Sequence, residues 1–207
     1  GERNAEEVLQ ATIDTFYERK SRSLTSEVFL LDQGTTADHQ VKILEKQRQH
    51  GFSTILLNRN VGISRAINLF VRTCKSPVAA LITSDVLITT GMDEDLYRKV
   101  QIPEVYQATP HADKSDVDYQ IWTPEAAYGS DHVDLAGLKR QGRPMMDRLF
   151  GKDDPGYFRC IAVEFNVIFW RREIFDRIGF FDERWKASFE NNDFSLRCFL
   201  DGGCTAI

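Results

Sequence analysis

The sequence contains no apolar run near the length of a membrane span, so we expect no transmembrane segment. It has no basic surplus either: 26 Lys and Arg stand against 31 Asp and Glu, a formal net charge of -5. Proteins that coat nucleic acids carry a basic surplus that neutralises phosphates, so this composition argues against nucleic acid as a partner. Neither a G-x-G-x-x-G fingerprint nor a Walker motif is present.

Cysteine is scarce, and its spacing fits no zinc site. The four residues are Cys74, Cys160, Cys198 and Cys204, and none belongs to a C-x-x-C pair. We expect reduced thiols, which favours a reducing, cytoplasmic compartment, with peripheral contact to a membrane left open.

The chain has enough apolar residues to bury a sizeable core. Of its 207 residues 42% are hydrophobic and 28% are charged. This length and composition are typical of one α/β domain, and no linker or internal repeat divides the chain. We therefore expect one domain over residues 1–207.

Helical and strand patterns alternate in the first half. Apolar residues recur at helical spacing after the candidate cap Asn4, over 37–50 and over 63–74, while short apolar runs at 27–32, 53–58 and 77–83 are typical of buried strands. Such alternation predicts an α/β fold with a mostly parallel sheet and helices on both faces.

The second half is less regular. A strand is expected within 104–110, followed by the polar segment His111–Pro155, which is rich in Asp, Gly and Pro. Long segments of this kind are typical of functional lids or binding loops, here with short helices expected near 136–140 and 145–150. A strand, a short helix and a turn follow Cys160, and a last helix begins near Glu190 and ends at Gly202.

Polar side chains follow three of the predicted strands. Asp32 ends the first strand, Asn58 and Asn60 follow the second, and Asp85 follows the third. Ligands of parallel α/β sheets bind at the carboxyl ends of the strands. A buried carboxylate there needs a partner, which is a metal, a base or a backbone amide. Asp and Asn at such positions also cap turns and helices, so both interpretations stay open.

Four stretches in this order resemble glycosyltransferase family 2: "VFLLDQGTTAD", "NRNVGISRAIN", "ALITSDVLITTGMDEDL" and "FDERWKASFENNDFSLRCFLDGG". The resemblance covers most of the chain outside His111–Pro155. It implies the GT-A (Rossmann-like) fold, a three-layer α/β/α sandwich. Residues 1–100 would form the nucleotide-sugar-binding half and residues 101–207 the acceptor-side half.

The resemblance also implies roles for residues of the donor side. Asp32 matches the family acid that contacts the nucleobase, usually uracil. Asn60, Gly62 and Asn68 match the stretch that frames the donor site.

A metal site is implied at Ser84 and Asp85, which match the family's DxD-type motif in a one-acid form, "TSDV". One carboxylate combined with substrate phosphates suits Mg²⁺ or Mn²⁺. Such an ion neutralises charge on the departing nucleoside diphosphate.

The catalytic motif departs from the family pattern. Asn191 stands where the family has its usual Asp base, and an amide cannot take a proton from a sugar hydroxyl. If the chain is catalytic, the base must be Glu190 or Asp193. We favour Glu190, because it precedes the helix at a point that a ligand can reach, whereas Asp193 and Arg197 are spaced to pair on one helix face. Trp185, just before this motif, is the candidate for contact with the acceptor.

These features predict an inverting glycosyltransferase that moves a sugar from a nucleotide-diphosphate donor, with UDP favoured, to a hydroxyl. The acceptor is a glycan, a lipid-linked molecule or another hydroxyl compound, and polysaccharide biosynthesis is a setting by family analogy alone. The alternative is a catalytically impaired nucleotide-sugar-binding or scaffold domain, which Asn191 favours. A nucleotidyltransferase fits less well, because its glycine-rich basic donor loop is absent.

Family members begin with a strand that precedes the first helix of this chain, and they continue beyond its last residues. We therefore expect a fragment. The additional strand would lie beside the strand that leads to Asp85, and its loss would leave backbone groups unpaired.

Overall fold

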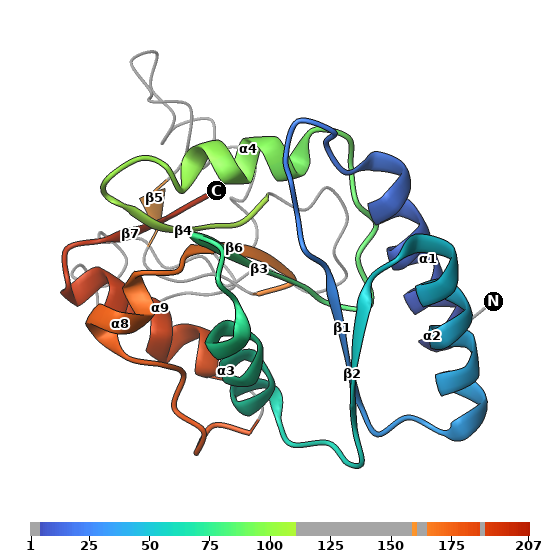
Figure 1. Ribbon diagram of the computed structural model, residues 1–207. Coiled ribbons are helices and arrows are strands. Elements are labelled where there is room, and N and C mark those ends of the chain that lie inside the picture. The colour runs from blue at the N-terminus through green and yellow to red at the C-terminus, as the bar shows by residue number, and fades with distance from the viewer. Residues whose placement is uncertain (1–4, 111–158, 161–164, 187–188) are drawn as a thin grey trace, which may run out of the picture.

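The computed structural model describes residues 5–110, 159–160, 165–186 and 189–207 (Figure 1). In these residues the order of elements is α1 (Ala5–Arg19), β1 (Phe29–Gln33), α2 (Ala37–His50), β2 (Ser53–Leu57), α3 (Ile63–Thr73), β3 (Val78–Ile82), α4 (Met92–Lys99), β4 (Val105–Ala108), β5 (Arg159–Cys160), β6 (Val167–Arg171), α8 (Ile174–Ile178), α9 (Glu190–Leu200) and β7 (Cys204–Ala206). The expected cap at Asn4, the segment His111–Pro155 and its short helices lie outside the described residues.

The described strands form two sheets. β1 and β2 pair in parallel, and five strands pair in the order β3-β6-β4-β7-β5. In the larger sheet β4 and β7 are parallel, whereas the β3–β6, β4–β6 and β5–β7 pairings are antiparallel. The α/β class is as expected, but this sheet is more mixed than the alternation predicts. The direction of β6 does not follow from a strand–helix–strand crossover, which is the pattern that implies parallel pairing.

Helices cover both faces of the larger sheet, which gives three layers (Figure 1). Val167 and Phe169 of β6 pack on the same side as Met92 and Leu96 of α4. The alternate residues Ile168 and Trp170 pack on the opposite side, in the cluster that includes residues of α3, α8 and α9. Successive side chains of a strand point to opposite faces, so β6 belongs to both cores.

The β1–β2 pair has a smaller core of its own, in which Ile13 of α1, Ile43 of α2 and Phe52 pack together. Among the described residues β1 pairs with β2 alone and β3 with β6 alone, so no ladder joins the two sheets.

A buried polar network within the larger sheet joins β4 to its neighbours β6 and β7 and to α9. Gln107 of β4 is fully buried and donates to Ser195 Oγ at 2.7 Å and to Thr205 Oγ1 at 2.6 Å. Its Oε1 accepts from Trp170 Nε1 at 3.0 Å. The sequence pattern did not indicate β7, because three residues are too short for a periodic signal. No helix in the described part of the chain is both long and apolar enough to span a membrane.

Candidate active site

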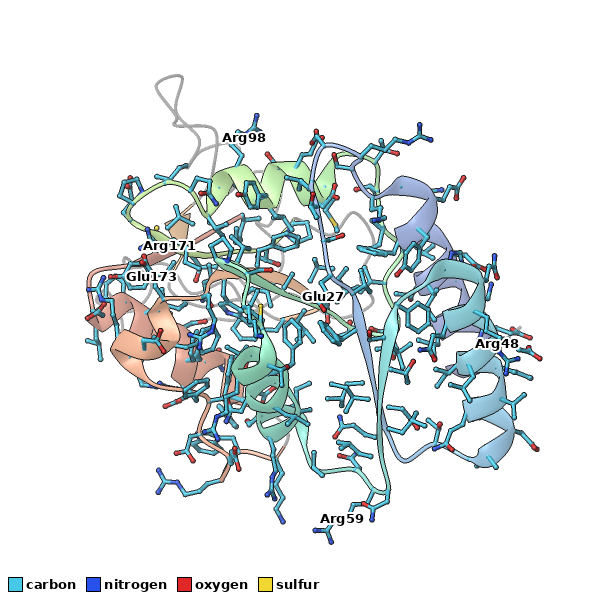
Figure 2. The ribbon with its side chains drawn as sticks, in the orientation of Figure 1. Glu27, Arg48, Arg59, Arg98, Arg171 and Glu173 are labelled. Atoms are coloured by element: carbon cyan, nitrogen blue, oxygen red, sulfur yellow. The ribbon has the colours of Figure 1, made fainter. Side chains whose placement is uncertain are left out.

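The loops after β1 and β2 are joined at the carboxyl ends of these strands. Val61 donates its backbone N–H to Gln33 Oε1 at 3.1 Å. Gly34 lies so close to the second loop that a Cβ on it would be 2.8 Å from the Cα of Arg59. Arg59 itself extends away from the fold (Figure 2). The loops after β1 and β2 therefore lie against each other at this edge.

Asp32 is buried, with 3% of its surface exposed. Its Oδ1 accepts from the backbone N–H of Thr35 at 3.1 Å, and its Oδ2 accepts from Gln40 Nε2 at 3.0 Å. The carboxylate thus stabilises the turn into α2, as Asp after a strand commonly does. Contact with a nucleobase would require Gln40 to move aside.

Asp85 is exposed, and only one of its two carboxylate oxygens accepts a hydrogen bond from a described residue. Thr83 Oγ1 donates to Asp85 Oδ1 at 2.6 Å, and Oδ2 has no hydrogen bond to a described residue. No group of three His, Cys, Asp or Glu side chains that could hold a metal occurs among the described residues. One carboxylate beside a hydroxyl offers hard oxygen ligands, which fit Mg²⁺ or Mn²⁺ if a ligand supplies the remaining oxygens.

Helix α1 positions the loop that carries Ser84 and Asp85. Thr12 Oγ1 donates to the carbonyl of Ser84 at 2.9 Å, and Thr15 Oγ1 accepts from the N–H of Ile88 at 3.2 Å. The side chain of Ser84 remains at an exposed position. The sequence did not indicate the role of the two threonines, because their hydrogen-bond partners lie 72 and 73 residues away in the chain.

The start of α3 contacts the loop that carries Trp185. Asn60 Oδ1 accepts from the N–H of Gly62 at 2.8 Å. Gly62 has φ +89°, and a Cβ there would lie 3.1 Å from the carbonyl oxygen of Lys186. That carbonyl accepts from the N–H of Ile63 at 3.3 Å, and Ser64 Oγ donates to the carbonyl of Trp185 at 2.7 Å. Gly62 thus allows a close approach between the loop before α3 and the loop that carries Trp185.

The side chain of Asn68 is hydrogen-bonded to other residues of the chain. Its side chain is 2% exposed; Nδ2 donates to the carbonyl of Phe181 at 2.9 Å and to Glu183 Oε1 at 3.1 Å. Its Oδ1 accepts from the N–H of Phe181 at 2.9 Å. Asn68 therefore holds the 181–183 turn, and its polar atoms are committed to this contact.

Glu190 begins α9, and its Oε2 is a buried oxygen without a hydrogen-bond partner among the described residues. Buried polar atoms are rarely left unpaired, and such atoms are often found where a ligand binds. Asn191, in place of the usual Asp, is buried at 5% exposure. Phe189 precedes them with φ +67°, the one non-glycine residue of positive φ in the described chain.

Asp193 is held in an ion pair. Arg197 donates to Asp193 Oδ2 from Nε at 3.1 Å and from Nη2 at 2.8 Å. The same guanidinium donates to the carbonyls of Ile178 and Phe180 at 2.8 and 3.1 Å. The expected pairing is confirmed, and it ties α9 to the turn after α8.

Trp185 and Phe189 form an exposed aromatic pair beside Glu190. Their ring centroids are 5.9 Å apart, with 41% and 61% of the respective residues exposed. Exposed aromatic faces of this kind can contact the apolar face of a sugar ring.

The layered sheet with acids at its strand ends defines an α/β domain of the GT-A class. The chain belongs to glycosyl transferase family 2, whose sequence profile matches residues 3–189. No curated protein sequence matches the chain.

Three solved structures have a similar fold. They are the mannosyltransferase PcManGT from Pyrobaculum calidifontis in complex with GDP-Man and Mn²⁺ (TM-score 0.67, 12% identity, 99% of this chain and 51% of that chain), GalNAc-T7 with UDP, GalNAc and Mn²⁺ (0.69, 15%, 96% and 39%) and TarS 1–349 from S. aureus (0.59, 12%, 99% and 55%). At these identities the similarity shows the fold. The chain spans 39% to 55% of the length of these proteins.

Proposed function

We propose that this chain carries the donor site and the catalytic base of an inverting glycosyltransferase that uses a nucleoside-diphosphate sugar. The main support is Glu190 Oε2, a buried oxygen at the start of α9 with no hydrogen-bond partner among the described residues. Family membership and the nucleotide ligands named for two structural neighbours point to the same donor class. One neighbour holds UDP and another GDP-Man, so UDP is the first donor base to test and GDP the second.

In this proposal Glu190 takes the proton of an acceptor hydroxyl. The hydroxyl oxygen forms a bond to the anomeric carbon while the bond from that carbon to the diphosphate oxygen breaks, and the nucleoside diphosphate leaves with the electron pair. A single displacement inverts the configuration at that carbon. Asp193 is the weaker candidate for the base, because Arg197 donates two hydrogen bonds to its Oδ2.

Asp85 and the Thr83 hydroxyl would hold a divalent ion, Mg²⁺ or Mn²⁺, together with the donor phosphates. When bound, the ion supplies positive charge that stabilises the leaving diphosphate. The Mn²⁺ named in two neighbouring structures supports this assignment. Asn60 and Gly62 would shape the donor side through the turn that they form, and Ser84 would line it.

Trp185 and Phe189 would receive the acceptor next to Glu190. The acceptor that suits two exposed rings is a glycan, free or lipid-linked, which agrees with a role in polysaccharide biosynthesis. A cytoplasmic location is part of this proposal and rests on the free thiols of Cys74 and Cys198.

Titration of UDP with and without Mn²⁺, followed by calorimetry, tests the donor site. We expect Mn²⁺-dependent binding that Asp85→Ala abolishes, while Glu45→Ala, which removes an exposed carboxylate of α2, leaves it intact. If a folded chain binds neither UDP nor GDP in Mn²⁺, the proposal is wrong.

The base is tested separately, by release of UDP from UDP-sugars. Removing a general base costs about 10²–10⁴-fold in rate, so Glu190→Gln should bind UDP normally and turn over that much more slowly. A buried Asn191 favours the second candidate, a domain that binds nucleotide sugars without transferring them. That candidate predicts UDP binding in the wild type with no turnover for Glu190→Gln to reduce.

A further inference from the structure

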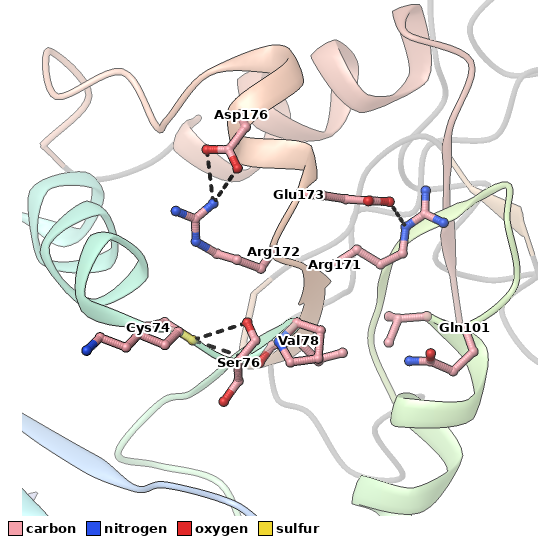
Figure 3. A pocket seen from close by; sticks show the side chains of 11 residues that line it. Cys74, Ser76, Val78, Gln101, Arg171, Arg172, Glu173 and Asp176 are labelled. Carbon is pink, nitrogen blue, oxygen red and sulfur yellow. Dashed lines mark hydrogen bonds and ion pairs between the residues drawn. The ribbon is translucent and has the colours of Figure 1, made fainter.

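A hollow of about 740 Å³ lies at the opposite end of β3 from Asp85 (Figure 3). Its walls come from the segment between α3 and β3, from the end of α4 and from the turn between β6 and α8. It begins at Val78, the first residue of β3, whereas the candidate donor site follows the last residue of that strand. The two sites are therefore distinct.

Cations outnumber carboxylates in this hollow. Lys75, Arg171 and Arg172 line it together with Glu173 and Asp176. In a chain with a formal net charge of -5 this is a local excess of positive charge. Lys75 is exposed and makes no ion pair with a described residue. Charged surroundings of this sign attract anions.

The two arginines are neutralised to different extents. Arg172 Nη1 donates to both carboxylate oxygens of Asp176, at 3.2 and 3.1 Å, as the dashed lines in Figure 3 show. The nearest carboxylate to Arg171 is that of Glu173, whose Oε1 is 3.5 Å from Nε. At that distance and geometry the contact is an ion pair without a hydrogen bond, because Arg171 Nε has no hydrogen-bond partner among the described residues.

Arg171 is thus a mostly buried side chain whose Nε donates no hydrogen bond to a described residue. Its side chain is 18% exposed, and its Nε is fully buried. The guanidinium carbon lies 5.1 Å from the centre of the Tyr106 ring. None of its N–H groups donates a hydrogen bond to a described residue. Burying such a charge is unfavourable unless an anion completes the site.

We propose that this hollow binds a phosphate monoester, with Arg171 as the principal contact. A phosphate carries about -1.5 to -2 charges at pH 7 and offers three acceptor oxygens, which suits a guanidinium in the wall of a hollow with excess positive charge. The planar guanidinium donates two parallel hydrogen bonds to such a group. The phosphate belongs either to a free phosphorylated compound or to a lipid headgroup.

Calorimetric titration with inorganic phosphate, at an ionic strength held constant with NaCl, tests the site on the unmodified chain. Arg171→Gln should weaken phosphate binding at least about tenfold, which corresponds to about 1.4 kcal/mol. Glu173→Gln removes the competing carboxylate and should tighten binding. Arg98→Gln, which changes an exposed arginine of α4, should leave the dissociation constant unchanged.

A higher dissociation constant for phosphate in Arg171→Gln and a lower one in Glu173→Gln support the proposal. Absence of phosphate binding in the wild type, or equal affinity in the wild type and Arg171→Gln, overturns it. If Arg171→Gln does not fold, unchanged affinity in Glu173→Gln overturns it instead. Vesicles with an anionic phospholipid, compared with neutral vesicles, then assign the source: Arg171-dependent binding to the anionic vesicles identifies a headgroup, and phosphate binding alone identifies a free phosphorylated compound.

Discussion

Replacing Asn68 with alanine tests whether this residue holds the acceptor-side turn or frames the donor. The amide donates to the carbonyl of Phe181 and accepts from its N–H, both at 2.9 Å, and Phe181 is 3% exposed. Alanine leaves these two buried backbone groups unpaired. Each such group costs about 1–3 kcal/mol, so the free energy of unfolding should fall by about 2–6 kcal/mol.

Urea unfolding followed by circular dichroism measures this loss, with an unchanged m-value as the sign that the same cooperative unit unfolds. Asn58→Ala is the matched control, because Asn58 is exposed and has no side-chain hydrogen bond among the described residues. It should change the free energy of unfolding by no more than about 0.5 kcal/mol.

A second measurement separates the two roles of Asn68. If the residue positions the 181–183 turn, Asn68→Ala disturbs the loop that continues to Trp185 and raises the KM for the acceptor, while the affinity for UDP stays the same. Loss of UDP affinity without loss of stability would refute the reasoning and restore the donor-framing role that the family resemblance implies.

Three further predictions concern backbone strain, pH and thiol reactivity. Gly62→Ala should lower the free energy of unfolding more than Gly202→Ala, by about 1 kcal/mol or more in urea titrations, since both have φ +89° but Gly62 alone would also place a Cβ 3.1 Å from a carbonyl oxygen. Partial burial acts to raise the pKa of Asp14, but the hydrogen bond and charge of Lys46 outweigh it, and the pKa is lowered. The Asp14 carboxylate should therefore stabilise the fold at pH 7. This stabilisation should diminish below the pKa of an unfolded Asp, about 3.9, and vanish as the pH falls through the folded-state pKa. Asp14 is half exposed, so Asp14→Asn should cost no more than about 1 kcal/mol at pH 7 and nothing at the acid end, in urea titrations at each pH. Burial raises the pKa of the Cys198 thiol, so an aromatic disulfide reagent at pH 8 should label Cys198 only after unfolding; labelling in the folded chain would contradict its placement in the core.

The sequence predicts the elements of the first half well, because their signals are local. Apolar spacing indicates α2, which spans Ala37–His50 as expected, with Gly51 at its end in the left-handed conformation. A glycine followed by several acids is another local signal for the start of a helix, and α4 begins after Gly91 with Asp93, Glu94 and Asp95 in its first turn. The i, i+4 spacing of Asp193 and Arg197 also predicts a contact that the structure contains.

Residues of the candidate site are less well predicted where a local pattern allows two roles. The contact of Asp32 with a nucleobase stays a prediction, and in the structure its oxygens accept hydrogen bonds from Thr35 and Gln40 in the segment that follows. Asp85 was expected to be available to a metal, and one of its oxygens is free of hydrogen bonds to the described chain. The distinction depends on neighbours that each side chain meets only after folding.

Periodicity, turn glycines and the placement of acids after strands were readable in the amino-acid order, because each involves residues within a few positions of one another. The antiparallel pairing of β6, the capture of the 181–183 turn by Asn68 and the position of the Arg171 guanidinium beside the Tyr106 ring were not. Asn68 and Phe181 are 113 residues apart, and a hydrogen bond across that separation leaves no periodic signal in the chain. Such contacts form only when the packing of both cores brings distant segments together, so the folded arrangement alone assigns these residues their roles.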